Sequence, residues 1–324
     1  MKAIVCRAYG PPESLVFEEV PSPLPGPGEV VATMKAASVN FQDVLIIQNK
    51  YQVKPPLPFT PGAEMSGVVK AVGEGVSHVR PGDRVLAYIT YGAFAEEVLI
   101  AANRVVPMPE GMDFTTAAAF LLTYGTSDHA LSDRGALQPS ETLLVLGAAG
   151  GVGLAAIEIG RALDARVIAC ASTDAKLAVC VAHGAHETIN YKTDDLRDRI
   201  RSLTEGRGVD VVYDVVGGEF TEPALRSLAW RGRLLVVGFA TGEIPRIPMN
   251  LPLLKGCAIV GVFYGEFARR EPERLASRIR QLGKWFTGGQ LKPHVSTLLP
   301  LSRAADAINL LASRQATGKV VLIS

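Results

Sequence analysis

Leu143-Leu-Val-Leu-Gly-Ala-Ala-Gly-Gly-Val-Gly153 is the stretch that decides the fold. Its apolar residues 143–146 have the length of a buried parallel strand, and after the glycines apolar residues recur with helical spacing, as at Leu154 and Ile157. The glycines let the backbone approach a pyrophosphate, while the N-terminus of the helix offers unpaired N–H groups and a positive dipole end. The stretch therefore predicts a strand, a turn and a helix that bind a dinucleotide.

The motif by itself leaves an alternative open. Against the pattern G-x-G-x-x-G this chain has Ala148 in the first position, so a glycine-rich turn in another kind of α/β protein also fits. The next apolar run, residues 166–171, is short and β-rich, and it ends about 20 residues beyond the turn, where the group that reads the ribose is expected. This spacing favours a dinucleotide site.

The end of this second strand indicates which dinucleotide binds. An acidic residue directly at the strand end would bind the ribose 2′-hydroxyl of NAD and repel a 2′-phosphate. Here Ser172 and Thr173 stand first and Lys176 follows; together with Tyr191 they could hold the phosphate, which predicts NADPH. Asp174 argues against this, unless it is the N-cap of the next helix and points away from the nucleotide.

The composition fits an enzyme without macromolecular partners. The chain has 324 residues, of which 48% are hydrophobic and 20% charged, enough for two domains with their own cores. Its 33 basic and 32 acidic residues leave a net charge of +1, so no electrostatic footprint for nucleic acid or an anionic membrane exists. No apolar run reaches the ~18 residues of a membrane span, and the first residues lack the apolar core of a signal peptide. We expect a cytoplasmic protein that binds neither nucleic acid nor membrane.

The cysteines and histidines predict no metal site. Four cysteines at positions 6, 170, 180 and 257 are dispersed, without a C-x-x-C pair. The five histidines form no recognisable zinc set. We expect the cysteines to be reduced thiols of the core.

Two patterns divide the chain. Residues 1–112 alternate extended runs with Pro/Gly punctuation, which is an all-β pattern, whereas strand and helix alternate from residue 115, beginning with a helix over 116–131. The later part predicts a doubly wound sheet of six parallel strands, with one further helix over 219–230. After it come helices over 272–286 and 303–313 and a last strand over 319–323, which we expect to return to the first domain. The catalytic cleft would lie between the two domains.

Several motifs along the whole chain then carry a family resemblance. They are Val39-Asn40-Phe41-Gln42-Asp43, residues 54–64, Gly82-Asp83-Arg84-Val85, residues 148–153, Asn190-Tyr191, residues 214–218 and Gly318-Lys319-Val320-Val321. Together they resemble the medium-chain dehydrogenase/reductase superfamily, and within it the zinc-free quinone oxidoreductase (zeta-crystallin-like) branch. The resemblance implies an α/β fold in which a GroES-like β-rich catalytic domain (residues 1–120 and 266–324) is split around a doubly wound Rossmann domain (residues 121–265).

The residues at the zinc positions of this superfamily exclude a zinc alkoxide mechanism. Zinc-dependent alcohol dehydrogenases have a cysteine where Asn40 stands and a histidine where Ala63 stands. Glu64 and Asp43 alone cannot supply the about three protein ligands that a catalytic zinc needs. The cysteines of the structural zinc lobe are also missing, since residues 86–97 contain none. What remains is hydride transfer from a nicotinamide without a metal.

The resemblance also implies a set of site residues. Asn40 and Asp43 would lie beside the nicotinamide, although Asn40 could instead be a loop-capping amide and Lys319 a charge at a strand edge. The residues implied to bind the cofactor are Asn40, Thr126, Ala149, Gly150, Gly151, Val152, Ser172, Thr173, Lys176, Tyr191, Gly238, Phe239, Ala240, Val262, Phe263, Tyr264 and Lys319.

The substrate is harder to infer than the cofactor. Tyr51 resembles a tyrosine that enoyl reductases of the superfamily carry in this loop, so it is a candidate proton donor, although it could merely pack against the proline-rich loop. Leu45 stands where many quinone reductases have a tyrosine, which makes the pocket less polar.

Three functions are compatible with the sequence. The first is an NADPH-dependent quinone reductase, and the second is an NADPH-dependent enone or trans-2-enoyl thioester reductase. The third is an NADPH-binding structural or RNA-binding crystallin-like protein, which the absence of a basic cluster with interleaved aromatics disfavours. The apolar run 258–262 near the end of the sheet predicts a homodimer whose sheets join edge to edge.

Overall fold

The computed structural model describes all residues 1–324 and divides them into two compact units. The split unit comprises Met1–Leu122 and Pro293–Ser324, and the central unit comprises Thr123–Lys292. The sequence placed the second boundary after residue 265, whereas the structure places it at 292. The later boundary has a clear cause, because α10 (Pro272–Thr287) is tied to the central unit through ion pairs of Arg274 with Asp133 and of Arg278 with Asp128.

The central unit is built on six parallel strands in the order β10-β9-β8-β11-β12-β13, which confirms the predicted doubly wound sheet. The strands of its middle are buried along their length, so they read as unbroken apolar runs rather than as an alternating pattern. The strands are β8 (Thr142–Leu146), β9 (Arg166–Ala171), β10 (Glu187–Asn190), β11 (Val209–Asp214), β12 (Leu228–Val236) and β13 (Ala258–Gly261).

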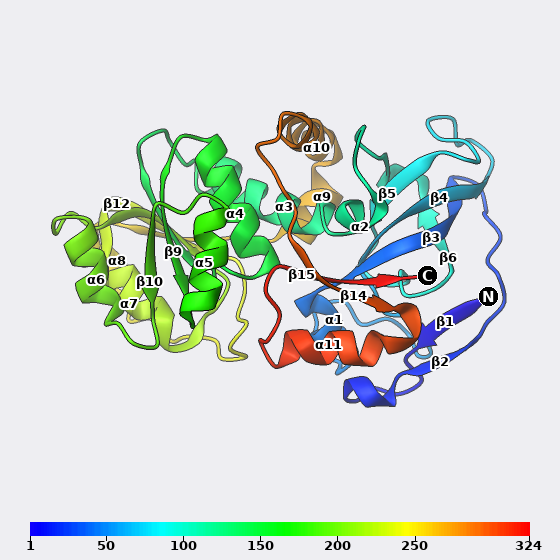
Figure 1. Ribbon diagram of the computed structural model, residues 1–324, viewed down its shortest axis with the longest axis horizontal. Coiled ribbons are helices and arrows are strands. Elements are labelled where there is room, and N and C mark those ends of the chain that lie inside the picture. Colours follow the sequence, from blue (N-terminus) through cyan, green and yellow to red (C-terminus); the bar gives the residue numbers. More distant parts are fainter. The chain divides into compact units, whose positions relative to one another are not determined.

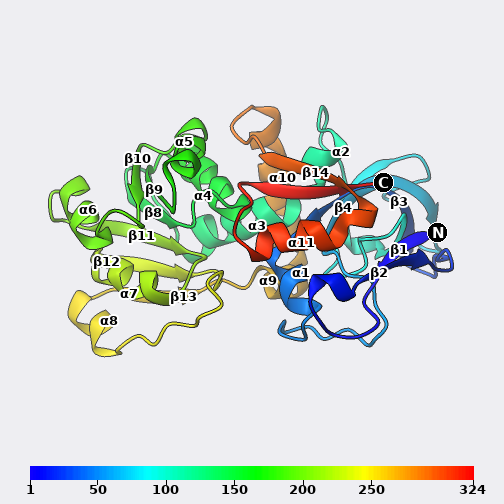
Figure 2. The same ribbon diagram turned by 60° about the horizontal axis from the view of Figure 1, so that its bottom comes forward.

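Helices cover both faces of this sheet. Figure 2 shows α4 and α5 on one side and α7 and α8 on the other, as expected where the direction of strand addition reverses at β8. The helices and helical turns of the unit, besides α10, are α3 (Leu121–Asp128), the π-helical segment η3 (His129–Arg134), α4 (Gly151–Ala162), α5 (Asp174–Ala182), α6 (Leu196–Leu203), η4 (Gly218–Phe220), α7 (Thr221–Arg226), α8 (Asn250–Lys255) and α9 (Tyr264–Arg270).

Two predicted helices differ in the structure. The single helix expected over 116–131 is interrupted at Ala119, so α2 (Phe114–Ala118) and α3 are separate. The break frees the N–H of Leu122 in the first turn of α3, and the buried carboxylate of Glu64 accepts it at 2.8 Å. The helix expected over 219–230 ends at Arg226, because the residues from Leu228 pair with β11 as the start of β12.

The split unit contains a seven-stranded sheet in the order β14-β15-β3-β4-β5-β7, with β6 also paired to β3. The last strand, β15, runs antiparallel to β3 and parallel to β14, which confirms that the C-terminus returns to the first domain (Figure 1). The elements are β1 (Lys2–Val5), η1 (Pro12–Ser14), β2 (Val16–Glu19), β3 (Glu29–Val39), α1 (Phe41–Ile46), β4 (Glu64–Val72), β5 (Arg84–Tyr88), β6 (Glu97–Ala101), η2 (Ala102–Arg104), β7 (Val105–Pro107), β14 (Val295–Pro300), η5 (Leu301–Arg303), α11 (Ala304–Ala312) and β15 (Lys319–Ile323).

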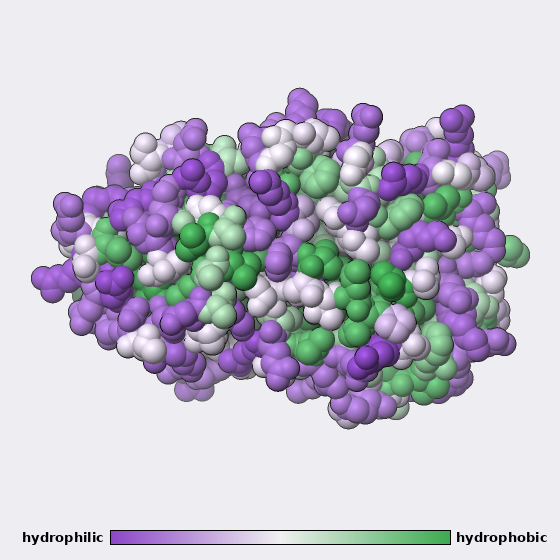
Figure 3. Space-filling model, in the orientation of Figure 1, coloured by the Kyte–Doolittle hydropathy of each residue, from purple (hydrophilic) through white to green (hydrophobic).

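The core of the split unit joins residues from both ends of the chain. Met34 on β3, Met65 on β4 and Leu322 on β15 are all fully buried in it, together with Ile308 on α11. Apolar side chains also reach the surface over β14, as Figure 3 shows, and Leu298 on this edge strand is 51% exposed. The four cysteines form no disulfide, and Cys6, Cys170 and Cys180 are buried. None of the helices has the length and apolar character that crossing a membrane requires.

Candidate functional site

The glycine turn has the geometry of a phosphate site. The chain leaves β8 through Gly147, which has a φ of +69°, and α4 begins directly after Gly150. A Cβ on Gly153 would lie 2.4 Å from the carbonyl oxygen of Gly147, so only glycine lets the helix pack this closely on the turn. At Gly150, by contrast, the nearest atom would be 3.5 Å away. The turn is thus tight beneath the helix and open above its N-terminus, where an anion fits.

The predicted nucleotide residues of the central unit gather at one edge of its sheet. Because the strands are parallel, their carboxyl ends meet at that edge, where α/β proteins bind ligands. Residues 149–152 follow β8, Ser172, Thr173 and Lys176 follow β9, Tyr191 follows β10, residues 238–240 follow β12, and residues 262–264 follow β13.

Thr126 reaches the same edge from α3. On one side of it, the ring of Tyr264 packs on Gly125, where a Cβ would lie 2.4 Å from the tyrosine hydroxyl. On the other side, the hydroxyl of Ser127 donates to the carbonyl of Val152 at 2.8 Å. Thr126 therefore lies between the carboxyl end of β13 and the start of α4.

The residues predicted to read the ribose lie at the start of α5. Thr173, not Asp174, is the N-cap, and its Oγ1 accepts the backbone N–H of Lys176 at 3.3 Å. Asp174 is the first residue of the helix, and its carboxylate accepts from the side chain of Asn190 at 2.8 Å. The N-cap alternative for Asp174 was therefore wrong. Its carboxylate is nevertheless hydrogen-bonded to Asn190, at the end of the neighbouring strand β10. Tyr191 lies against Phe220 with ring centroids 4.5 Å apart.

A buried polar cluster of the split unit, here named the Asn40 cluster, consists of Ser38, Asn40, Asp43, Glu64 and Lys319. Strand register brings it together: β3 ends next to Asn40, Ser38 pairs with Glu64 at the start of β4, and Val39 pairs with the residue after Lys319 on β15.

Hydrogen bonds fix every polar group of this cluster. The ammonium of Lys319 donates to Asn40 Oδ1 and, at 3.1 Å, to the carbonyl of Val39. The Asn40 amide nitrogen donates to the carbonyl of Ser38 at 3.1 Å. Asn40 is also the N-cap of α1, so it serves both as a capping residue and as part of the cluster. The strand-edge alternative for Lys319 was wrong, because β15 lies between β14 and β3 and Lys319 is only 6% exposed.

Both carboxylates of the Asn40 cluster are already engaged by the protein. Asp43 accepts the backbone N–H groups of Asn40 at 2.8 Å and of Gly62 at 3.1 Å. Glu64 accepts the hydroxyl of Ser38 at 2.8 Å, besides the N–H of Leu122. No three His, Cys, Asp or Glu side chains are arranged to hold a metal ion.

Burial dominates the electrostatics of the cluster. Loss of solvent raises the pKa of Asp43 to about 7, although its two backbone donors and Lys319 act in the opposite direction. Burial also raises the pKa of Glu64, and it lowers the pKa of Lys319 despite the two nearby carboxylates. These shifts disfavour the ionised forms of Asp43, Glu64 and Lys319. The protonation state of each group therefore depends on the charges of the other two.

Tyr51 is partly buried in the split unit. Its ring packs on the core of the split unit, while its hydroxyl is in hydrogen-bonding contact with Tyr88 on β5. Burial and the nearby Asp43 raise the pKa of Tyr51. Tyr88 was not found from the sequence, because nothing local marks it: its place follows from its pairing with Glu64 across β4 and β5.

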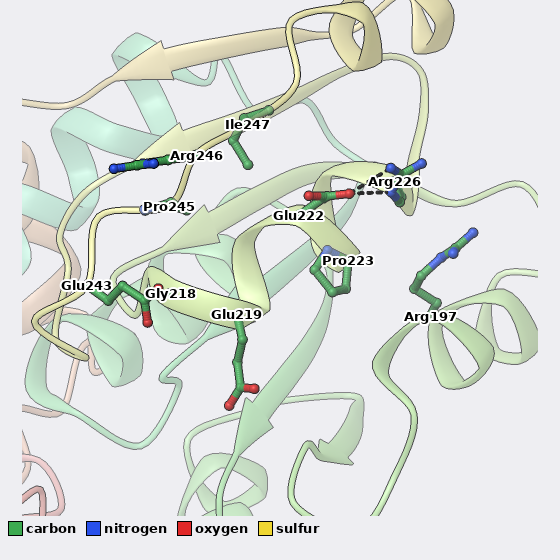
Figure 4. Close-up of a pocket in the computed structure, with 10 residues that line it drawn as sticks. All are labelled: Arg197, Gly218, Glu219, Glu222, Pro223, Arg226, Glu243, Pro245, Arg246 and Ile247. Carbon is green, nitrogen blue, oxygen red and sulfur yellow. Dashed lines mark hydrogen bonds and ion pairs between the residues drawn. The ribbon is translucent and has the colours of Figure 1, made fainter.

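A separate pocket of about 390 Å³ lies on the central unit between α6, α7 and residues 243–247 (Figure 4). Arg226 in its wall is paired with Glu222 at 2.6 Å, and Arg197 and Arg246 come from two other segments. None of the predicted nucleotide residues lines it. Its wall carries charges of both signs without a buried polar group, so we assign no chemistry to it.

Family models and individual relatives agree with this architecture. The model of a zinc-binding dehydrogenase matches residues 151–281, and that of an alcohol dehydrogenase GroES-like domain matches residues 26–110. Quinone oxidoreductase-like protein 2 of Mus musculus is 38% identical over 323 residues, which cover 99% of this chain and 91% of the mouse protein.

Comparison with solved structures narrows the class of protein to which the chain belongs. The quinone oxidoreductase of Escherichia coli, solved in complex with NADPH, matches with a TM-score of 0.94 at 31% identity, and 100% of both chains is covered. The CurK enoyl reductase matches with a TM-score of 0.90 at 26% identity over 99% of this chain and 98% of that one. A Rossmann unit and a GroES-like unit built from both chain ends define a medium-chain dehydrogenase/reductase. Within that class, the chain belongs to the quinone oxidoreductase family.

Proposed function

We propose that the protein is an NADPH-dependent, zinc-independent reductase that transfers hydride to a quinone or a similarly activated carbonyl or alkene. The observation that carries this proposal is the open glycine turn at Gly150, followed at the next strand end by two hydroxyls and Lys176. The NADPH complex of the Escherichia coli relative supports the same cofactor.

The residues present fit NADPH. The open N-terminus of α4 suits the pyrophosphate, with residues 149–152 around it. Ser172, Thr173, Lys176 and Tyr191 surround the place of the 2′-phosphate, and Asp174 is held by Asn190 rather than left to repel it. The nicotinamide supplies the hydride, while the protein supplies binding, orientation and polarity.

We assign the Asn40 cluster a positioning role at the nicotinamide end. Lys319 and Ser38 hold the amide of Asn40 from both sides, so its dipole has one fixed direction. Asp43 in turn fixes the start of α1 and the loop at Gly62. A rigid amide of this kind can orient a ring carrying its own amide group without taking part in bond breaking.

The proposed zinc independence is supported by the two buried carboxylates of the Asn40 cluster, which already accept hydrogen bonds from the protein. Asp43 and Glu64 have four donors between them, and the two positions where zinc-dependent relatives have cysteine and histidine hold Asn40 and Ala63. We expect the purified protein to contain no stoichiometric zinc and to keep its activity in chelator. A tightly bound zinc, or loss of activity on chelation, would contradict the proposal.

The choice between quinones and alkenes as substrates depends on how the reduced product obtains its proton. A reduced quinone can take its protons from water, whereas an enoyl product benefits from a placed acid. The quinone reading is supported by the family, and the alkene reading by Tyr51 and by the similarity to an enoyl reductase. NADPH oxidation measured with 1,4-naphthoquinone, an enone and a trans-2-enoyl thioester tests both. Turnover of none of them would refute the proposed activity.

We further propose that the protein is a homodimer joined through β13. This strand is the edge of the six-stranded sheet, and its Ile259 is 41% exposed. Trp230 near the start of the neighbouring strand β12 is 74% exposed, and on α8, which packs against β12, Leu253 is 78% and Leu254 70% exposed. An apolar edge of this kind invites pairing with another strand, and a second copy of the chain offers the matching edge.

A further inference from the structure

Asp214 is a buried carboxylate at the carboxyl end of β11, in the central unit. It is only 3% exposed. Its Oδ1 accepts the backbone N–H groups of Val216 at 2.8 Å and of Gly217 at 3.0 Å, and its Oδ2 accepts the hydroxyl of Thr221 at 2.6 Å. Three donors thus fix the turn that follows the strand, residues 214–218, here named the Asp214 turn.

The Asp214 turn has an unusual backbone and lies directly against the segment that follows β12, residues 238–243, here named the β12 loop. Gly217 has a φ of +71° and Gly218 one of +59°, in the left-handed region that favours glycine. A Cβ on Gly217 would lie 2.9 Å from the ring of Phe239, so the turn and the loop are closely packed. The N–H of Gly218 donates to the carbonyl of Glu243 at 3.1 Å, and these two residues lie next to each other in Figure 4.

Further hydrogen bonds build the β12 loop on the Asp214 turn. The N–H of Ala240 donates to the carbonyl of Val215 at 2.9 Å. The N–H and the hydroxyl of Thr241 both donate to the carbonyl of Val216, at 3.0 Å and 2.9 Å. Because these carbonyls belong to the turn that Asp214 fixes, the conformation of the loop depends on this carboxylate.

The place of the Asp214 turn in the sheet links it to the glycine turn as well. Asp214 pairs with Leu146, the last residue of β8. The direction of strand addition reverses between β8 and β11, and doubly wound sheets bind dinucleotides at such a point. A Cβ on Gly147 would lie 2.9 Å from the side chains of Val215 and Val216. The Asp214 turn therefore packs against the glycine turn on one side and supports the β12 loop on the other.

We propose that Asp214 is a positioning residue for the nicotinamide half of NADPH, which it serves by holding the β12 loop in the conformation that binds the cofactor. This inference rests on the proposed reductase function and deepens it, because Gly238, Phe239 and Ala240 of the loop are among the residues expected to bind the cofactor. Asp214 itself touches no part of the cofactor. An ordered loop binds more tightly because less conformational freedom is lost on binding, and affinity falls in proportion to the fraction of molecules whose loop is ordered.

The test compares two ligands that differ in the nicotinamide half. Calorimetry gives the Kd of NADPH and of 2′,5′-ADP, which keeps the adenosine and its 2′-phosphate but lacks the nicotinamide. We expect Asp214→Ala to weaken NADPH by about tenfold or more, the equivalent of one hydrogen bond to a charged group, and to leave 2′,5′-ADP within about twofold. Asp214→Asn should recover most of the loss, because its amide oxygen can accept the same two backbone N–H groups.

Asp210 provides a matched control at the opposite end of the same strand. It accepts the backbone N–H of Thr142 at 2.7 Å and forms an ion pair with Arg207 at 2.7 Å. Asp210→Ala should lower the stability to urea as Asp214→Ala does, yet leave the affinities for both ligands unchanged.

Thr241→Val tests the same link if Asp214→Ala does not fold, because it removes only the hydroxyl that joins the β12 loop to the Asp214 turn. It should weaken NADPH by about threefold, as expected for a neutral hydrogen bond. The affinity for 2′,5′-ADP should stay unchanged.

Three results would overturn the positioning role. These are equal weakening of NADPH and 2′,5′-ADP by Asp214→Ala, unchanged NADPH affinity in Asp214→Ala or in Thr241→Val, and an Asp214→Asn variant that binds NADPH no better than Asp214→Ala. All three would leave the proposed function intact. A wild type that does not bind NADPH would instead refute the proposed cofactor, and the role of Asp214 with it.

Discussion

Asp43 is the residue at which burial and hydrogen bonding compete most directly. Two backbone N–H groups stabilise its carboxylate, yet complete removal from solvent outweighs them and raises its pKa to about 7. In the unfolded chain the pKa is near its ordinary value of about 4. Folding therefore favours the protonated form, and the stability that Asp43 contributes is present below about pH 4 and lost as the pH rises to about 7.

Replacing Asp43 by asparagine should remove this pH dependence. We expect the free energy of unfolding of Asp43→Asn to fall less between pH 5 and pH 7 than that of the wild type, by about 1 kcal/mol per pH unit. Urea unfolding across this range measures the slope, and Asp306→Asn, at a half-exposed position, serves as control. Equal slopes for Asp43→Asn and the wild type would show that Lys319 keeps the carboxylate ionised throughout.

Lys176 is the residue on which we propose that cofactor choice depends. A charged contact to a phosphate is worth about 1.5 to 3 kcal/mol, so Lys176→Ala should weaken NADPH by one to two orders of magnitude, at roughly 1.4 kcal/mol per decade. NADH, which lacks the phosphate, should bind nearly as before. Titration of both cofactors by fluorescence or calorimetry checks this. Equal weakening of both cofactors would show that Lys176 does not bind the 2′-phosphate, and Asp174 would then be the candidate ligand of the ribose.

Residue by residue, the sequence predicted the site unevenly. Asn40 and Asp43 were found because they stand in one contiguous motif, and the structure places them at the start of one helix. The environment of Lys319 was misjudged and Tyr88 was missed for one physical reason. Each enters the site through pairing between strands far apart in the chain, at β15 with β3 and at β5 with β4. Such register is not encoded in any local pattern.

Among the elements, the turn from β8 into α4 contains two glycines with different roles. Gly153 is required for the packing of the helix, whereas Gly150 leaves room for a ligand. A Cβ on Gly153 meets backbone oxygens at 2.4 and 2.6 Å, whereas one on Gly150 meets nothing within 3.4 Å. The φ of Gly150 is −77°, which alanine adopts without strain. The two glycines thus form a matched pair for substitution.

Alanine at these two positions should separate stability from binding. We expect Gly153→Ala to lower the free energy of unfolding by about 1–3 kcal/mol or more, because the helix must move away from the turn. Gly150→Ala should change it by less than about 1 kcal/mol yet weaken NADPH, because its methyl group occupies the open side of the turn. Thermal or urea unfolding with and without NADPH measures both effects. Unaltered NADPH affinity in Gly150→Ala would mean that the pyrophosphate lies elsewhere.

Elements with local signals were predicted well. The doubly wound sheet of six parallel strands, α10 and β15 were expected from apolar runs and helical spacing, and the structure confirms them, although residues 228–230 of β12 had been assigned to a helix. The break between α2 and α3 was not predicted, because it depends on the carboxylate of Glu64, 58 positions away along the chain. A helix end capped by a distant side chain leaves no mark in the helix's own sequence.

For the whole molecule, the exposed apolar edge at β13 makes association testable. Leu253 on α8, which packs against the neighbouring strand β12, is 78% exposed, and we expect a charge there to be buried in the proposed dimer. We expect the wild type to sediment as a dimer and Leu253→Lys to shift it towards the monomer. Leu24→Lys is the control, since Leu24 is 85% exposed in the split unit. A monomeric wild type would contradict the proposed assembly.

The position of β15 has a consequence for biosynthesis. The central unit is one continuous segment, so it can fold as soon as it has left the ribosome, because domains generally fold as units during synthesis. The split unit cannot, because residues 36–39 of β3 lack their partner strand until β15 (Lys319–Ile323) is made, although β6 already pairs with residues 29–33. A nascent chain therefore carries this open part of β3 until β15 has been synthesised. Loss of β15, by a premature stop codon or a protease, should leave that part of β3 exposed to aggregation.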